Sequence, residues 1–214
     1  MKTSYFWGVD SSQVTTVIML SPTARGEQYS ISSYTPSGEK YKELTLVVSD
    51  STGASLELQN ILREILPESG LRHASFKVDY PDSGYVTSRL NCTNNSTIAG
   101  ELRQVSTSQP AFYPKTFSRG VRSYLVLVNV SEQPIEAIVR VVAQNRAPEK
   151  NYEIAANATL LINLEVDFDE IADMSFKQRV PAYVRARCKL ENAMCVGFFE
   201  QILDDNISVF SIVN

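Results

Sequence analysis

The sequence predicts an all-β protein in which one β-domain occurs twice in tandem. Short β-branched and aliphatic runs alternate with polar turns that contain Pro or Gly, which is the pattern of a sandwich or barrel. In residues 122–164, where this pattern is clearest, no long segment has the apolar period of a helix. Features of this region recur, less sharply, in the first half of the chain.

The region from Arg122 to Leu164 predicts three or four consecutive strands. Ser123 to Val130 is an aliphatic run typical of a strand buried on both faces, and it ends in a turn closed by Pro134. Ile135 to Val142 follows, with Arg140 indicating one wetter face. A second turn leads into the last part of the series, at residues 152–164.

The first half predicts a similar series. Its expected strands are residues 4–8, 15–21, 27–34, 41–48 and 54–58. Asn60 to Leu66 predicts one or two helical turns before Pro67.

Short identities relate the last third of each half. Ser75-Phe76-Lys77 recurs at residues 175–177, and YVTSRLNC from Tyr85 aligns with YVRARC from Tyr183 at an offset of 98. Both stretches predict hairpins with alternate residues facing a core. We therefore expect two domains, residues 1–108 and 109–214. Residues 206–213 predict an extra strand that closes an edge or crosses to a partner chain.

The order of strand types is clearest in residues 111–202. A short aromatic strand precedes runs like SYLVLVN, EAIVRVV and NATLLINL, and a closing hairpin like YVRARC…VGFFEQ follows. This order resembles bacterial immunoglobulin-like β-sandwich repeats, more particularly the small domain of the sensory rhodopsin transducer family. The resemblance implies two tandem immunoglobulin-like β-sandwiches that oligomerise and act by binding. It assigns no functional residue.

Composition excludes several classes of protein. The net charge of −4 argues against a nucleic-acid partner, whose binding proteins are normally basic. Asp10 and the polar Ser11-Ser12-Gln13 interrupt any signal sequence near the N-terminus. No apolar run reaches the roughly 18 residues of a membrane helix. We expect a soluble, cytoplasmic protein without a membrane span, or a secreted one if a signal peptide has been removed.

Catalytic chemistry is poorly represented. The one histidine, His73, leaves little for a nucleophile–base pair and excludes a multi-histidine metal site; it is expected on the surface or in a loop. Cys188 and Cys195 flank a predicted turn, where reduced thiols are preferred over a cross-strand disulfide; Cys92 has no obvious partner. We expect no enzyme activity, cofactor or metal.

Four residues are candidates for a binding surface: Trp7, Tyr113, Arg185 and Arg187. The aromatic runs at residues 5–7 and 112–113 suit a sugar platform or an interface, although core packing also explains them. Arg179, Arg185, Arg187 and Lys189 form either a basic binding face or a solvated one.

Two further patterns have plain explanations. The acidic residues between Glu165 and Asp173 are interpreted as a solvated linker, with a hard-cation site as the alternative. The Asn-X-Ser/Thr triplets are read as products of turn chemistry rather than as glycan sites. They begin at Asn91, Asn94, Asn95, Asn129, Asn157 and Asn206.

These observations favour a non-enzymatic interaction module that binds a protein partner or itself, through sheet edges or the C-terminal strand. The alternative is a protein that binds carbohydrate or another small ligand, in a cleft between the repeats or on exposed aromatic residues.

Overall fold

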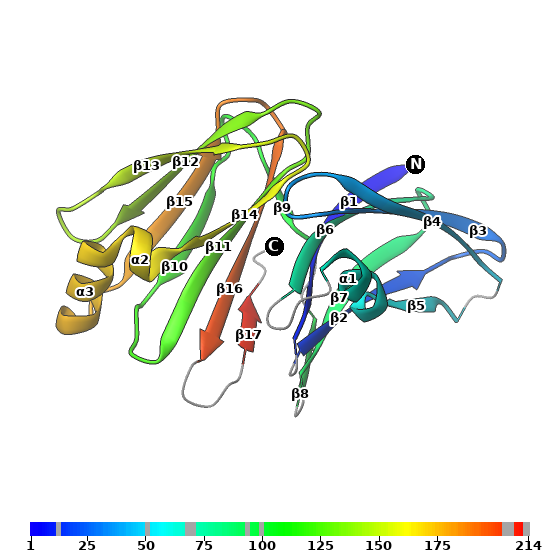
Figure 1. Cartoon of the computed structure of the whole chain (residues 1–214), viewed down its shortest axis with the longest axis horizontal. Helices are drawn as coiled ribbons and strands as arrows, with labels where there is room; N and C mark the ends of the chain where they lie inside the picture. The colour runs from blue at the N-terminus through cyan, green and yellow to red at the C-terminus, as the bar shows by residue number, and fades with distance from the viewer. Residues whose placement is uncertain are drawn as a thin grey trace. The chain divides into compact units, whose positions relative to one another are not determined.

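The structure is a computed structural model that describes residues 1–11, 14–49, 52–66, 72–92, 95–98, 101–202 and 208–211. These residues are mostly β-strand, and their sheets are antiparallel, as the sequence predicts (Figure 1). The chain divides into two compact units, residues 1–102 and 103–213.

The first unit contains one continuous sheet. Its strands are β1 (Lys2–Asp10), β2 (Val14–Ser21), β3 (Glu27–Tyr34), β4 (Lys40–Val48), β5 (Ala54–Glu57), β6 (Arg72–Tyr80), β7 (Tyr85–Cys92) and β8 (Asn95–Ile98). They pair in the order β4-β3-β6-β1-β2-β7-β8, and β5 also pairs with β2. β1 joins β2 at the pair Asp10–Thr15, near the turn between them.

The strands on both sides of the β1–β2 junction, β4-β3-β6-β1 and β5-β2-β7-β8, contribute to one core. Phe6 and Phe76, which are cross-strand neighbours on β1 and β6, belong to the same buried cluster as Ile18 on β2 and Val86 on β7. Leu62 of helix α1 (Gln59–Ile65) completes the cluster. The predicted helical turns near Asn60 are therefore confirmed, and the helix is held by packing.

The second unit is a sandwich of two sheets. Its strands are β9 (Arg103–Val105), β10 (Ala111–Lys115), β11 (Val121–Asn129), β12 (Ile135–Val142), β13 (Glu149–Ile154), β14 (Thr159–Asn163), β15 (Ala182–Cys188), β16 (Met194–Ile202) and β17 (Ser208–Ser211). One sheet has the order β10-β15-β12-β13; the other has β14-β11-β16-β17, and β9 also pairs with β16. Tyr113 and Val184 from the first sheet share a core with Leu125 and Val196 from the second.

The strand orders of the two units match when strands are counted from β1 in the first and from β10 in the second. Strands 4-3-6-1 are neighbours in each unit, and so are strands 5-2-7-8. A helical segment also lies between strands 5 and 6 in each unit. On this count β7 corresponds to β16, and β6 to β15.

The predicted alignment of the last third is wrong. Residues 75–77 lie on β6, whereas residues 175–177 lie on helix α3 (Asp169–Gln178). The predicted hairpin from Tyr183 is also wrong, because β15 pairs with β10 and β12 while β16 pairs with β11 in the other sheet. Side-chain alternation identifies a strand but does not specify its partner, so a few identities were insufficient to fix the register.

The positions of the cysteines follow from this strand pairing. Cys188 lies on β15 and Cys195 on β16, in different sheets, and both are buried thiols. Burial raises the pKa of the Cys188 thiol above its ordinary value, which disfavours the reactive thiolate. The side chain of Cys92 lies outside the described residues.

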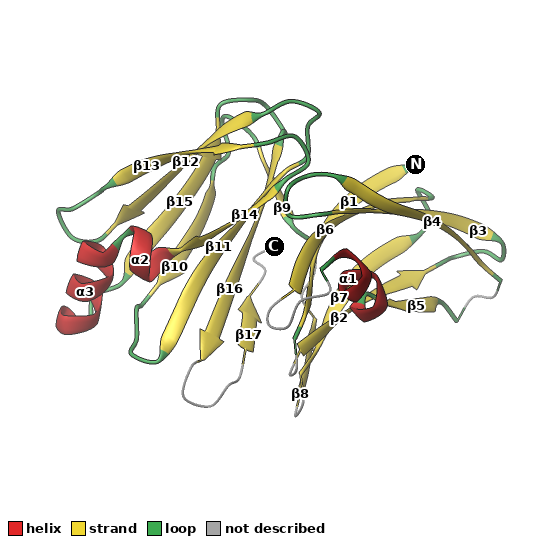
Figure 2. Cartoon of the chain, viewed as in Figure 1, coloured by secondary structure: helices red, strands yellow, loops and turns green. Residues whose placement is uncertain are grey.

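The acidic stretch is helical, so its interpretation as a linker is wrong. It forms α2 (Leu164–Asp167) and α3 (Figure 2). The Asn163 side chain accepts hydrogen bonds from the backbone N–H groups of Glu165 and Val166, and so caps α2. Acidic residues in the first turn of each helix also interact favourably with the positive end of the helix dipole. Neither these helices nor α1, which are all the helices described, is long and apolar enough to cross a membrane.

Asn129 is fully buried and organises two turns of the second unit. Its Nδ2 donates to the carbonyl oxygens of Gln133 (2.8 Å), Ile154 (3.1 Å) and Ala155 (2.8 Å). Its Oδ1 accepts from the backbone N–H and the hydroxyl of Ser131, both at 2.8 Å. In the folded chain this amide is occupied by hydrogen bonds and is not presented for glycosylation.

Replacing Asn129 with Ala should lower the free energy of unfolding by roughly 2–4 kcal/mol, because buried carbonyls lose their donor. Urea unfolding of the full chain, followed by circular dichroism, measures the change. Asn151→Ala is the matched control: its side chain is exposed, so we expect a change within about 0.5 kcal/mol. Equal effects of the two substitutions would contradict a structural role for Asn129.

Candidate binding face

The candidate aromatic residues Trp7 and Tyr113 are buried. Each is 2% exposed. The Trp7 ring lies 5.9 Å from the ring of His73 on β6, and Tyr113 stacks on Phe198 with ring centroids 5.8 Å apart. Neither ring is available on the surface of this structure.

The neighbour of Tyr113 takes the exposed position instead. Along β10, Ala111, Tyr113 and Lys115 point into the second unit, while Phe112 and Pro114 point outward. Phe112 is 54% exposed, and Tyr183, on the adjacent strand β15, is 52% exposed. Period-2 alternation predicts that one of residues 112 and 113 faces out, but the sequence of this short strand does not show which.

Arg185 and Arg187 lie on the same side of the sheet as Phe112. Their neighbours on β15, Val184 and Ala186, are buried in the core, so the arginines face away from it. We call this solvent-facing side of β10-β15-β12-β13 the outer face. It consists of Phe112, Pro114, Glu136, Ile138, Arg140, Val142, Glu149, Asn151, Glu153, Tyr183, Arg185 and Arg187.

Arg185 is positioned by stacking. Its guanidinium carbon lies 5.5 Å from the centre of the Phe112 ring, directly across the β10–β15 pair. This is within the range of a cation–π contact. The Arg185 Nε is buried and has no hydrogen-bond partner among the described residues. The stack therefore holds a cation at the surface and leaves part of its hydrogen-bonding capacity unused.

Two cross-strand pairs on the outer face carry like charges. Arg140 on β12 is opposite Arg185 on β15, and Glu136 on β12 is opposite Glu153 on β13. Like charges directly opposite each other destabilise a sheet. Lys189 forms an ion pair with Glu136 at 2.7 Å and offsets part of the acidic charge. Glu149 on β13 stands directly opposite Arg140 and forms an ion pair with Arg187 at 3.5 Å.

Arg140 and Glu153 retain exposed, unpaired charges. Neither makes a hydrogen bond or an ion pair with another residue in the described part of the chain. The outer face thus has a basic pair beside Glu149 and an acidic pair beside Lys189.

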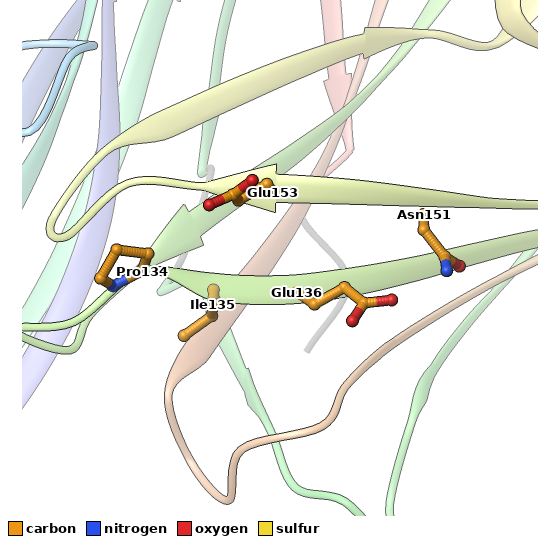
Figure 3. A pocket seen from close by; sticks show the side chains of 5 residues that line it. All are labelled: Pro134, Ile135, Glu136, Asn151 and Glu153. Carbon is orange, nitrogen blue, oxygen red and sulfur yellow. The ribbon is translucent and has the colours of Figure 1, made fainter.

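A pocket of about 450 Å³ lies at the acidic pair. It is lined by Pro134, Ile135, Glu136, Asn151 and Glu153, which come from the turn before β12 and from β12 and β13 (Figure 3). Two carboxylates from neighbouring strands suit a guanidinium or an amine, which donates hydrogen bonds to them and neutralises their charge. The described residues contain no cluster of three or more His, Cys, Asp or Glu side chains arranged to hold a metal ion.

The other predicted acidic and basic residues are dispersed. Asp167 pairs with Lys150, Glu170 with Arg146 and Asp173 with Lys177. The Glu165 carboxylate accepts the backbone N–H of Ser123 at 2.7 Å. Arg179 ends α3 in a left-handed conformation, away from the alternation of β15. These contacts stabilise the second unit locally.

His73 lies within strand β6, so its predicted place in a loop is wrong. Strand pairing with β1 puts it on the same side as Val9, beside Trp7. Burial lowers the pKa of its imidazole from 6.5 to about 4. The ring is therefore neutral at pH 7.

Comparison with known proteins adds no assignment: neither a protein-family model nor a curated protein matches the chain.

His73 should make stability depend on pH. Between pH 6.5 and 4 the histidine is protonated in the unfolded chain but neutral in the folded chain. The contribution of His73 to the free energy of unfolding, fully present above pH 6.5, is therefore lost as pH falls. The loss should reach roughly 3 kcal/mol at pH 4. His73→Phe keeps a ring beside Trp7 and removes the titration.

Urea unfolding at a series of pH values compares the two proteins. Because His73 is the only histidine, the difference between their curves isolates its contribution. The wild-type curve should fall more steeply than that of H73F below pH 6.5. Parallel curves would show that burial does not depress the pKa of this histidine.

Proposed function

We propose that the chain is a non-enzymatic interaction module that binds a protein partner through the outer face. The observation that carries the proposal is the exposure of Phe112 and Tyr183 beside Arg185 on an ordered sheet. Aromatic and arginine side chains are enriched at protein interfaces and supply most hot spots. A sheet face that exposes both types side by side has the composition of a binding surface.

The outer face is preorganised by the core beneath it. Val139, Val184 and Ala186 are completely buried between the sheets, on the same strands that carry the outward residues. Their packing fixes the spacing and direction of the outward side chains. Less conformational entropy is lost on binding when a surface is already ordered.

We further propose that each unit is an immunoglobulin-like sandwich and that the second arose as a copy of the first. The matching strand orders support this. Neighbours 2–5 and 3–6 correspond to the B–E and C–F neighbours of an immunoglobulin domain. Strand 1 lies beside strand 6, where G would be, and strand 7 lies beside strand 2, where A would be. The proposal is therefore a variant topology, within which the resemblance to sensory rhodopsin transducer domains also remains a proposal.

Carbohydrate binding is the alternative that exposed aromatic residues favour. Sugar recognition needs an open ring face, and the guanidinium of Arg185 covers one face of Phe112. Tyr183 remains open, but the nearby pocket is lined by two carboxylates rather than by rings. These features support protein binding better.

Capture of partners from a native lysate tests the proposal. The tagged full chain should retain specific proteins that the double variant Phe112→Ser/Tyr183→Ser loses, with recovery reduced about tenfold or more. The control Tyr85→Ser removes another exposed aromatic residue, on β7 of the first unit, and should behave as wild type.

Melting curves of the variants establish that each remains folded. Retention of the same proteins by all three chains would contradict binding through the outer face. Equal loss from the double variant and from Tyr85→Ser would also contradict it.

A further inference from the structure

We infer that the partner of the outer face presents a short acidic segment, and that Arg140 and Arg185 together bind one of its carboxylates. This inference rests on the proposed function and names the chemistry of the partner. It is argued from the positive charge that the chain leaves without a counter-charge around Arg140.

Arg140 and Arg185 present guanidinium groups at the same place. They stand directly opposite each other on β12 and β15, and neighbouring strands are about 5 Å apart. Arg140 is exposed and makes no hydrogen bond or ion pair within the described residues. Arg185 stacks on Phe112, and its Nε has no hydrogen-bond partner in the same part of the chain. Both cations therefore have donors to offer.

The carboxylate of Glu149 does not neutralise this pair. Glu149 stands opposite Arg140 on the other side of β12, but its ion pair is with Arg187, at 3.5 Å. Three arginines against one glutamate leave two positive charges in excess at this end of the outer face. A partner that brings carboxylates here supplies the missing counter-charge.

A carboxylate matches the two guanidinium groups in shape as well as in charge. A planar guanidinium donates parallel hydrogen bonds to the two oxygens of a carboxylate, which gives direction to the contact. A carboxylate between Arg140 and Arg185 would also offset the repulsion between these like charges. Because the stack on Phe112 already orders Arg185, less side-chain entropy is lost when the carboxylate binds.

The exposed rings specify what flanks the carboxylate. Phe112 stands opposite Arg185 on β10, and Tyr183 precedes Arg185 by two residues on the same face of β15. Both rings are about half exposed. Apolar or aromatic side chains next to the acidic residue would pack on them. The recognised chemistry is therefore Asp or Glu with apolar neighbours.

The acidic pair restricts the partner to a short segment. Glu136 and Glu153 lie two positions further along the strands, at roughly 13 Å from the arginine pair. Lys189 neutralises Glu136, but Glu153 is unpaired within the described chain. A long polyanion such as a nucleic acid would cross this part of the face and be repelled.

Selection from a phage-displayed library of random peptides on the immobilised full chain tests the inference. We expect the enriched peptides to contain Asp or Glu next to aromatic or aliphatic residues. Fluorescence anisotropy of labelled copies then measures their dissociation constants. Changing the acidic residue of a peptide to its amide should raise the dissociation constant about tenfold or more, because the shape is kept and the charge is lost.

R140E is the decisive variant, because it places a carboxylate opposite Arg185 within the chain. It exchanges one favourable neighbour, Glu149, for another, Arg185, so the melting temperature should stay near that of wild type. The dissociation constant of the acidic peptides should rise about tenfold or more, and the acid and its amide should then bind equally. R140Q removes the charge alone and should weaken binding in the same direction.

R122E is the matched control. It makes the same change of net charge at an exposed position of β11, in the other sheet, and should bind the peptides as wild type does. Equal weakening by R122E and R140E would show a general effect of net charge and overturn the inference.

Three further results would overturn it: no enrichment, enriched peptides without acidic residues, or binding that tolerates R140E and R140Q. Displacement of the peptides by millimolar inorganic phosphate, with glutamate at the same concentration having no effect, would exclude a carboxylate as the bound group.

The capture experiment separates this inference from the proposed function. Proteins that are lost by Phe112→Ser/Tyr183→Ser but retained by R140E would keep the outer face as the binding surface. They would exclude an acidic segment as the group that it recognises.

Discussion

The alternation of side chains along β15 is the constraint on which both the core and the outer face of the second unit depend. Val184 and Ala186 pack between the sheets, and Arg185 and Arg187 face out. A one-residue slip would bury guanidinium groups and expose the core, at a large desolvation penalty. The register that builds the sandwich therefore also aligns the arginines with Phe112 on one side and with β12 on the other.

Lys115 shows what this alternation tolerates when a charge does point inward. It is buried on β10, forms an ion pair with Glu200 and lies 5.8 Å and 5.9 Å from the centres of the Phe117 and Phe198 rings. A buried ammonium requires such a counter-charge, and the aromatic rings add attraction. The edge strand β10 thus keeps its register, and Phe112 its exposure, although one inward position is charged.

The sequence predicted the strands of residues 122–164 because their aliphatic runs are long and their turns carry Pro or polar residues. It also predicted that Arg185 and Arg187 face out, because they alternate with apolar residues and burying their charges would be too unfavourable. Phe112 was missed because β10 is short and residues 112 and 113 are both aromatic, so only pairing with β15 decides which faces out. The like-charged pairs were invisible for a related reason: they depend on the register between strands, which no single segment encodes.

Helix α3 was missed because its buried face is small. Ile171, Ala172 and Ser175 are its buried residues, too few to give a clear apolar period among so many acidic side chains. The correspondence between the two units was harder to predict because it lies in the order of the strands. Identities between β7 and β15 pointed to the wrong pair of strands, whereas the topology relates β7 to β16.

The most direct test of the outer face is an NMR titration of the full chain, with backbone amide spectra recorded as a protein captured from the lysate is added. The account predicts shift changes concentrated on β10, β15, β12 and β13, largest near Phe112 and Tyr183. Spectra that do not change, or changes concentrated on β14, β11 and β16, would contradict it.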